Sequence, residues 1–271
     1  GNVLNDKVWR RINSRITDTD IFTDQLALTG KFNTGTIKHK FNVGAEYSDQ
    51  ESNKGSYTTT YPGYAGTTTG GFNSDCKIND AWCTSLTNPN SKEEWLGTAV
   101  ANRNTTTTTT KVTSVYLLDN IEFNPQWLLD LGLRWDKFDT EQVTNATGAK
   151  LENNKDFFTY QAGLTFKPVE NGSIYASYAT SANPVGVDGG DGSEAIGQAY
   201  MDLKPEEART IELGTKWDLF NDRLNLTAAI FRTEKQNTRI QLDAGTYTNG
   251  GESKVDGIEL TATGKITDKW D

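Results

Sequence analysis

The feature that most constrains this chain is a period-2 alternation of apolar and polar residues along its whole length. The clearest case is the stretch from Trp127 to Trp135, in which Leu131 and Leu133 alternate with Gly132 and Arg134. Such alternation gives a strand with one apolar and one polar face. About nine segments follow this pattern, and none shows convincing helical periodicity. The sequence therefore predicts an all-β fold.

Two kinds of connection alternate between these strands. Short turns are expected at residues 33–35, 124–126, 168–172, 220–223 and 267–269. Long polar connections are expected at about 52–107, 142–154, 183–206 and 241–252. Antiparallel strands that are joined tightly at one end and loosely at the other form an up-and-down meander.

The two faces of the sheet separate a soluble sandwich from a membrane barrel. The strands are often longer than the roughly 5 to 6 residues usual in soluble proteins. Trp127 and Trp135 lie eight positions apart, about 20 Å of height in a tilted strand, close to the apolar band of about 25 Å between two aromatic girdles. The opposite face carries charges of both signs, including Glu46, Arg134 and Glu212, which a dry core would have to pair. The pattern favours a membrane β-barrel, and a soluble antiparallel sheet is the alternative.

With nine strands, the first and the last run in the same direction, so this chain alone does not close an antiparallel barrel. Bacterial single-chain barrels have even strand numbers, and unpaired edges in lipid cost several kcal/mol for each backbone group. Further strands of the same polypeptide are therefore expected upstream of Gly1 and beyond Asp271. Residues 1–271 are interpreted as a partial barrel, with the short turns periplasmic and the long loops extracellular.

Composition excludes several other classes of function. Lys and Arg number 27 against 36 Asp and Glu, a net charge of -9 without a basic stripe, so nucleic acid is not an expected partner. No run of about 18 apolar residues predicts a transmembrane helix. The single histidine, His39, and two cysteines leave the usual zinc and Cys/His catalytic sites incomplete. We expect no enzyme activity, metal site or cofactor.

Several motifs in a characteristic order resemble a known family. Leu203-Lys204-Pro205-Glu206 precedes a strand that carries Glu212, and segments 30–48, 115–139, 172–184 and 255–270 accompany it. Together they resemble the barrel of TonB-dependent outer-membrane siderophore receptors, and the catecholate type is the most similar. The resemblance implies a 22-stranded barrel with an N-terminal plug and a short energy-coupling box. This sequence contains neither plug nor coupling box, so it resembles a middle portion of the barrel.

The resemblance also implies a function in the bacterial outer membrane. The expected ligand is a ferric siderophore, catecholate rather than hydroxamate, imported when TonB moves the plug through a region outside this chain. Outer-membrane lipid and lipopolysaccharide would surround the barrel. A passive porin is one alternative, and an exported adhesin or soluble β-rich binding protein is another.

The longest connection holds the candidate site residues. Cys76 and Cys83 flank six residues there, and because two cysteines in an exported protein usually pair, a loop disulfide is predicted. A free redox or metal-binding pair is the alternative. Exposed aromatic residues stack on catechol rings and Arg attracts anionic iron complexes, although these aromatics would also pack the loop against itself. The ligand-binding candidates are Tyr57, Tyr61, Tyr64, Trp82, Trp95 and Arg103.

Overall fold

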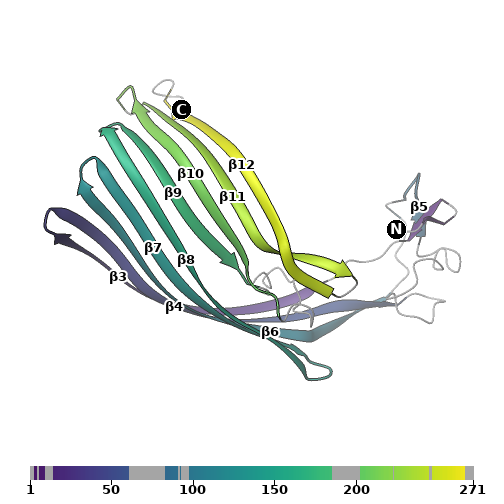
Figure 1. The fold of residues 1–271 in the computed structure, drawn as a ribbon. Coiled ribbons are helices and arrows are strands. Elements are labelled where there is room, and N and C mark those ends of the chain that lie inside the picture. Colours follow the sequence, from purple (N-terminus) through teal and green to yellow (C-terminus); the bar gives the residue numbers. More distant parts are fainter. Residues whose placement is uncertain are drawn as a thin grey trace. The chain divides into compact units, whose positions relative to one another are not determined.

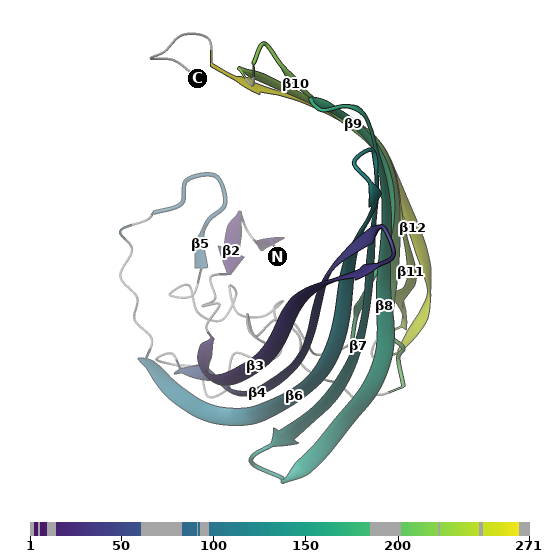
Figure 2. The ribbon, with the colours of Figure 1, turned by 90° about the vertical axis from the view of Figure 1, so that its left-hand side faces the viewer.

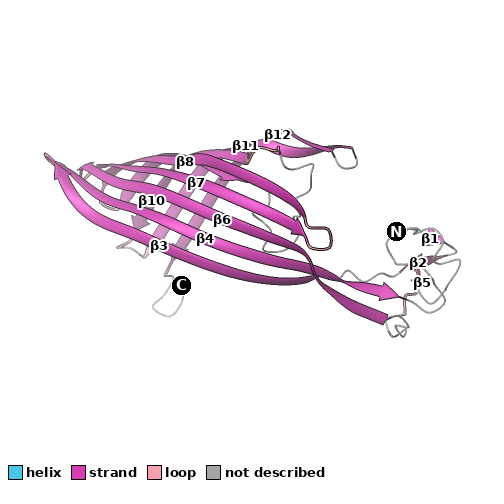
Figure 3. Cartoon of the chain, turned by 90° about the horizontal axis from the view of Figure 1, so that it is seen from below, coloured by secondary structure: helices cyan, strands magenta, loops and turns pink. Residues whose placement is uncertain are grey.

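The computed structural model describes residues 3–4, 6–9, 15–60, 83–90, 92, 98–184, 202–221, 223–243 and 246–265. The chain divides into two compact units. The smaller unit comprises residues 1–20, 52–108 and 143–150, and the larger unit comprises residues 21–51, 109–142 and 151–271. The described residues form strands and turns (Figure 3), and among them no helix is long and apolar enough to cross a membrane.

Nine long strands form one sheet in the order β12-β11-β10-β9-β8-β7-β6-β4-β3. In the larger unit they lie side by side in a single curved layer (Figures 1 and 2). Each is hydrogen-bonded to the next long strand along the chain, which confirms the meander. The bounds are β3 (Ile16–Thr34), β4 (Ile37–Thr60), β6 (Thr98–Asn124), β7 (Trp127–Thr144), β8 (Ala149–Val169), β9 (Gly172–Asn183), β10 (Glu206–Leu219), β11 (Leu224–Asp243) and β12 (Thr246–Gly264).

The smaller unit contains a separate three-stranded sheet in the order β1-β2-β5. Its strands are short and antiparallel. Their bounds are β1 (Val3–Leu4), β2 (Lys7–Trp9) and β5 (Cys83–Ser85). The alternation pattern did not identify these strands, because two or three residues are too few to show a period.

Local chemistry explains the tight turns. Gly35 has a φ of 65°, a conformation that glycine adopts without steric cost, in the two-residue turn between β3 and β4. At the β6–β7 turn, the Asn124 side-chain oxygen accepts hydrogen bonds from the backbone N–H groups of Gln126 and Trp127, at 2.9 and 3.1 Å. This arrangement replaces backbone partners in the turn. The turn expected at 267–269 lies outside the described residues.

The expected extent of three long connections was wrong. Strands continue through most of 142–154, where only residues 145–148 separate β7 from β8, and through most of 241–252, where β12 begins at Thr246. Within 52–107, β4 continues to Thr60 and β6 begins at Thr98. The physical reason is that strand ends beyond an apolar band are polar on both faces, so they lose the alternation while keeping their backbone pairing. The connection at 183–206 has the expected bounds.

Burial in this sheet is inverted relative to a soluble globule. In the described part of the chain, the buried hydrophobic residues are Cys83, Leu203 and Ala229. Large apolar side chains are exposed instead; Leu26 and Leu260, for example, are both 78% exposed. The buried polar side chains are Ser52, Thr108, Ser114, Asp136, Thr140, Gln142, Asn153 and Glu206. We call the apolar face of the larger unit the outer face and the polar face the inner face.

The outer face carries a continuous apolar row across five strands. The strand register pairs Leu164 with Ala176, Ala176 with Leu213, Leu213 with Ile230, and Ile230 with Ile258. Of these, Ile258 is 74% exposed. Exposing so much contiguous apolar surface to water is unfavourable, at about 25 cal/mol per Å², so this row requires a hydrocarbon environment.

Aromatic and charged side chains mark the limits of the apolar band. On β10 the outer face runs from Trp217 near a short turn to Arg209, whose guanidinium donates to Glu234 at 2.7 Å. Those eight positions correspond to about 20 Å of height at the usual tilt. Aromatic pairs occur near both limits: Trp127 with Phe166 (ring centroids 4.6 Å apart) and Tyr160 with Tyr178 (5.8 Å).

One prediction concerns the close approach of a tyrosine to a glycine on the inner face. A Cβ added at Gly214 would clash with the Tyr175 ring. The hydroxyl of that tyrosine donates a hydrogen bond to Glu212 Oε1 at 2.6 Å. We expect Gly214→Ala to lower the free energy of unfolding of the full receptor by about 1 to 3 kcal/mol, because the ring must move. Urea unfolding in lipid vesicles measures this. Gly163→Ala is the matched control, since its added Cβ would have no neighbour closer than 3.9 Å; equal effects of the two substitutions would contradict the packing argument.

Candidate functional site

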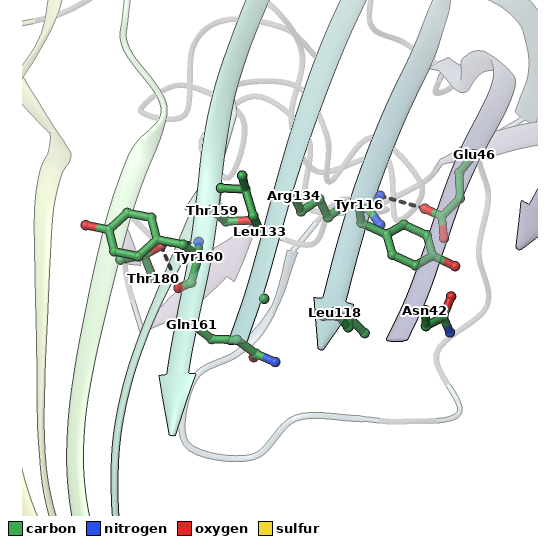
Figure 4. A pocket seen from close by; sticks show the side chains of 11 residues that line it. Asn42, Glu46, Tyr116, Leu118, Leu133, Arg134, Thr159, Tyr160, Gln161 and Thr180 are labelled. Carbon is green, nitrogen blue, oxygen red and sulfur yellow. Dashed lines mark hydrogen bonds and ion pairs between the residues drawn. The ribbon is translucent and has the colours of Figure 1, made fainter. Parts of the chain in front are cut away.

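An ion cluster centred on Arg134 of β7 occupies the inner face (Figure 4). Its Nη2 donates to Glu46 of β4 at 2.6 Å, and its Nε donates to both oxygens of Asp136 at 2.9 and 3.0 Å. The guanidinium carbon also lies 5.8 Å from the ring centroid of Tyr116 on β6. One arginine therefore forms ion pairs with two carboxylates and contacts an aromatic ring.

Neutral side chains complete the cluster. The Ser114 hydroxyl donates to Asp136 Oδ1 at 2.5 Å. Gln25 of β3 donates from Nε2 to Glu46 at 2.9 Å and to the Tyr116 hydroxyl at 3.0 Å. Because Asp136 is only 6% exposed, these hydrogen bonds and the Arg134 pair offset the cost of burying its charge. The network joins four strands, β3, β4, β6 and β7.

A hollow of about 440 Å³ lies beside this cluster. Its polar lining includes Asn42, Glu46, Tyr116, Arg134 and Gln161. Amide, phenol and guanidinium groups suit hydrogen bonding to a polypeptide or a polar ligand. No group of three or more His, Cys, Asp or Glu residues able to hold a metal occurs among the described residues.

A second cluster, in which a tyrosine contacts a carboxylate and a cation, lies on the inner face of β9 to β12. Tyr175 donates to Glu212, and Lys216 Nζ lies 5.4 Å from the Tyr175 ring centroid. Glu259 of β12 lies on the same face, since it pairs with Ala229, which pairs with Gly214. Within the described part of the chain neither Glu212 nor Glu259 has a Lys or Arg ion-pair partner. These two carboxylates leave the inner wall able to bind a cationic group.

The structure places two of the six predicted ligand residues, both in the smaller unit. Tyr57 lies near the end of β4 and is 41% exposed. Arg103 lies on β6 and forms an exposed ion pair with Asp18, at 3.6 Å. Tyr61, Tyr64, Trp82 and Trp95 lie outside the described residues. The proposed ligand set therefore stays a prediction.

The predicted disulfide also remains a prediction. Cys83 begins β5, is 3% exposed and does not have a free thiol. Cys76 lies outside the described residues, so the pairing of the two residues is not described.

Sequence reasoning missed the Arg134 cluster. Alternation assigned Glu46 and Arg134 to the polar face, but they lie on strands separated by β6, and only the register shows that they meet. The available signal was the presence of opposite charges on inner-face positions of nearby strands.

The fold and the candidate site together define the class of protein to which this chain belongs. A meander of long antiparallel strands with a lipid-type apolar outer face and a charged inner face is the wall of an outer-membrane β-barrel.

The family follows from comparison with known proteins. The family model described as TonB dependent receptor-like, beta-barrel, matches residues 2–271. The chain belongs to this family, and it corresponds to the β-barrel part of these receptors.

Two relatives illustrate the similarity. The chain is 57% identical to PiuA of Acinetobacter baumannii, described as a probable TonB-dependent siderophore receptor, over 100% of this chain and 37% of that protein. It is 29% identical to the catecholate siderophore receptor Fiu of Escherichia coli, over 98% of this chain and 36% of that protein. The chain thus spans a little over a third of the length of these relatives.

Comparison with solved structures leads to the same family. The crystal structure of the PiuA siderophore receptor matches with a TM-score of 0.87 at 57% identity, over 97% of this chain and 38% of that chain. The closed form of the ferric-catecholate import receptor Fiu matches with a TM-score of 0.73 at 26% identity, over 94% of this chain and 36% of that chain.

Proposed function

We propose that the whole protein is an outer-membrane receptor that imports a ferric siderophore, and that this chain forms part of its barrel wall. The observation that carries the proposal is the inverted burial, with apolar side chains on the outer face and buried ions on the inner face. Both edge strands, β3 and β12, need further partners in lipid. The relatives, which are much longer than this chain, support strands supplied by the rest of a receptor polypeptide.

The inner face supports a polar plug as the occupant of the lumen. Arg134 and its hollow offer hydrogen-bonding groups. Glu212 and Glu259 offer two carboxylates that have no Lys or Arg ion-pair partner among the residues that the structure describes. A plug with basic side chains would satisfy these groups. TonB would act on the plug through a region outside this chain.

A catecholate siderophore is the proposed ligand, because the catecholate receptor Fiu is among the relatives. The extracellular loops would capture it, with Tyr57, Arg103 and the aromatic residues of the longest connection as binding groups. Outer-membrane lipid and lipopolysaccharide would contact the outer face.

Uptake of radioactive iron by cells with and without the gene tests this function. We expect deletion to abolish uptake of a ferric catecholate, and an uncoupler of the proton-motive force to abolish it in complemented cells. Hydroxamate uptake should be unaffected. Uptake that persists with the uncoupler would indicate a passive porin, and unchanged uptake after deletion would contradict the receptor proposal.

A second prediction tests the loop site. Arg103→Ala should weaken binding of an anionic ferric catecholate to energy-depleted cells by about tenfold, because one guanidinium contact contributes on the order of 1.4 kcal/mol. Asp18→Asn is the control, since it removes the partner of Arg103 and leaves the guanidinium available. Binding that is equal or tighter is expected for the control. Unchanged affinity of Arg103→Ala would remove Arg103 from the site.

A further inference from the structure

A hydrogen-bonded pair of ionisable side chains lies on the outer face, which is otherwise apolar. His39 Nδ1 of β4 and Asp119 Oδ2 of β6 are 2.8 Å apart. Alternation along β6 places Asp119 in the same row as Val115, Leu117 and Phe123, which are 41 to 49% exposed. The pair therefore interrupts an apolar row that faces the membrane.

The pair lies toward the periplasmic side of the membrane. His39 is two positions after Ile37, the first residue of β4, and Asp119 is five positions before Asn124, the last residue of β6. Five positions in a strand tilted by about 40° correspond to about 13 Å of height. Short turns face the periplasm in barrels of this class, so both side chains reach the periplasmic leaflet of the bilayer.

The stability of the sheet does not account for this pair. The side chains of His39 and Asp119 are only 14% and 21% exposed, and Phe32 of β3 stacks on the His39 ring with centroids 4.4 Å apart. The second oxygen of Asp119, Oδ1, is buried and has no hydrogen-bond partner in the described part of the chain. Replacing a buried ion pair by apolar side chains is often neutral or stabilising, whereas ionisable groups in membrane-spanning segments mark functional sites. A binding partner would explain why the pair is present.

The geometry defines what the pair offers to a partner. A carboxylate only accepts hydrogen bonds, so the bond to Asp119 places the proton of a neutral imidazole on Nδ1 and leaves Nε2 as an acceptor. Within the described residues, Nε2 of His39 is not buried and has no hydrogen-bond partner, and no Lys or Arg forms an ion pair with Asp119. The pair therefore presents a hydrogen-bond acceptor next to a negative charge, which suits a cation that carries N–H groups.

We propose that the His39–Asp119 pair binds the ammonium group of a phospholipid in the periplasmic leaflet. A primary ammonium supplies a positive charge for the carboxylate and an N–H group for Nε2, while the acyl chains of the same lipid lie along the apolar row. A phospholipid fits the pair better than a lysine from a second copy of this chain. Lys111, Lys137 and Lys254 of the outer face lie ten or more positions from the short turns, so in a copy with the same membrane orientation they are at another level.

Native mass spectrometry of the full-length receptor, titrated with phosphatidylethanolamine, tests the proposal. In H39F/D119L we expect the affinity for this lipid to fall about tenfold, because the charge-assisted hydrogen bond and the carboxylate are lost. The matched control is K38Q/E122Q, which removes the ion pair between neighbouring positions of the same two strands, 2.9 Å apart on the inner face. Unchanged affinity is expected for this control.

The choice of head group provides a second measurement that needs no variant. Phosphatidylcholine carries a trimethylammonium group, which has no N–H to donate, so we expect the unaltered receptor to bind it about tenfold more weakly than phosphatidylethanolamine. The H39F/D119L receptor should bind the two lipids equally.

Three results would overturn the proposal. Equal affinity of the unaltered receptor and H39F/D119L for phosphatidylethanolamine would show that the pair does not contact the head group. Equal affinity of the unaltered receptor for both lipids would exclude recognition through an N–H group. A dimer of the unaltered receptor that is lost in H39F/D119L, with lipid binding unchanged, would assign the pair to an interface between copies instead.

Discussion

Replacing Arg134 by alanine is expected to lower the free energy of unfolding of the receptor by about 2 to 4 kcal/mol. The substitution leaves Asp136 and Glu46 on the inner face without their shared cation, and the Asp136 side chain is only 8% exposed. Removing one partner of a buried ion pair costs about 3 to 5 kcal/mol, and the partial exposure of Arg134, 35%, reduces that figure through solvent screening. Urea unfolding in lipid vesicles measures the change.

Removing all the charges of the cluster provides the control. In Glu46→Gln/Arg134→Met/Asp136→Asn no carboxylate is left unpaired, and Ser114 and Gln25 can still hydrogen-bond to the new amides. We expect this triple variant to recover most of the lost stability. An Arg134→Ala effect below about 0.5 kcal/mol would show that the cluster does not stabilise the wall.

An arginine placed on the outer face is expected to have a similarly large effect. Leu164 lies in the apolar row with Leu213 and Ile230. We expect Leu164→Arg to cost about 2 to 4 kcal/mol, the range for a cation facing lipid near the bilayer midplane. Refolding into vesicles followed by urea unfolding gives the value.

The neighbouring residue is the matched control. Thr165 is one position further along β8 and therefore faces the other side of the sheet, near Lys216 and Glu212. We expect Thr165→Arg to cost less than about 1 kcal/mol, because a polar lumen solvates the guanidinium. A larger penalty for Thr165→Arg than for Leu164→Arg would mean that the two faces have been assigned the wrong way round.

The sheet could be predicted from sequence because its signal is local. Alternation from Trp127 to Trp135 predicts both the strand and its apolar face, and the side-chain preference of Asn124 predicts the turn before it. The ends of the strands could not be predicted in the same way. Residues 152–156 are polar at every position, yet they belong to β8, because backbone pairing continues where no lipid imposes an alternation.

Contacts between strands were the least accessible to sequence reasoning. Arg134 and Glu46 are 88 positions apart, and the Tyr175–Gly214 contact depends on the register between β9 and β10. A shift of one residue in register would move these side chains to the opposite face.

The orientation of the two faces is tested most directly by nitroxide accessibility. Single labelled cysteines at positions 161 to 166 of β8, in the receptor reconstituted in lipid, would be measured for collision with oxygen and with a water-soluble nickel chelate. We predict oxygen accessibility maxima at 162, 164 and 166 and minima at 161, 163 and 165. Maxima at the odd positions, or no alternation at all, would contradict a wall with its apolar face in the membrane.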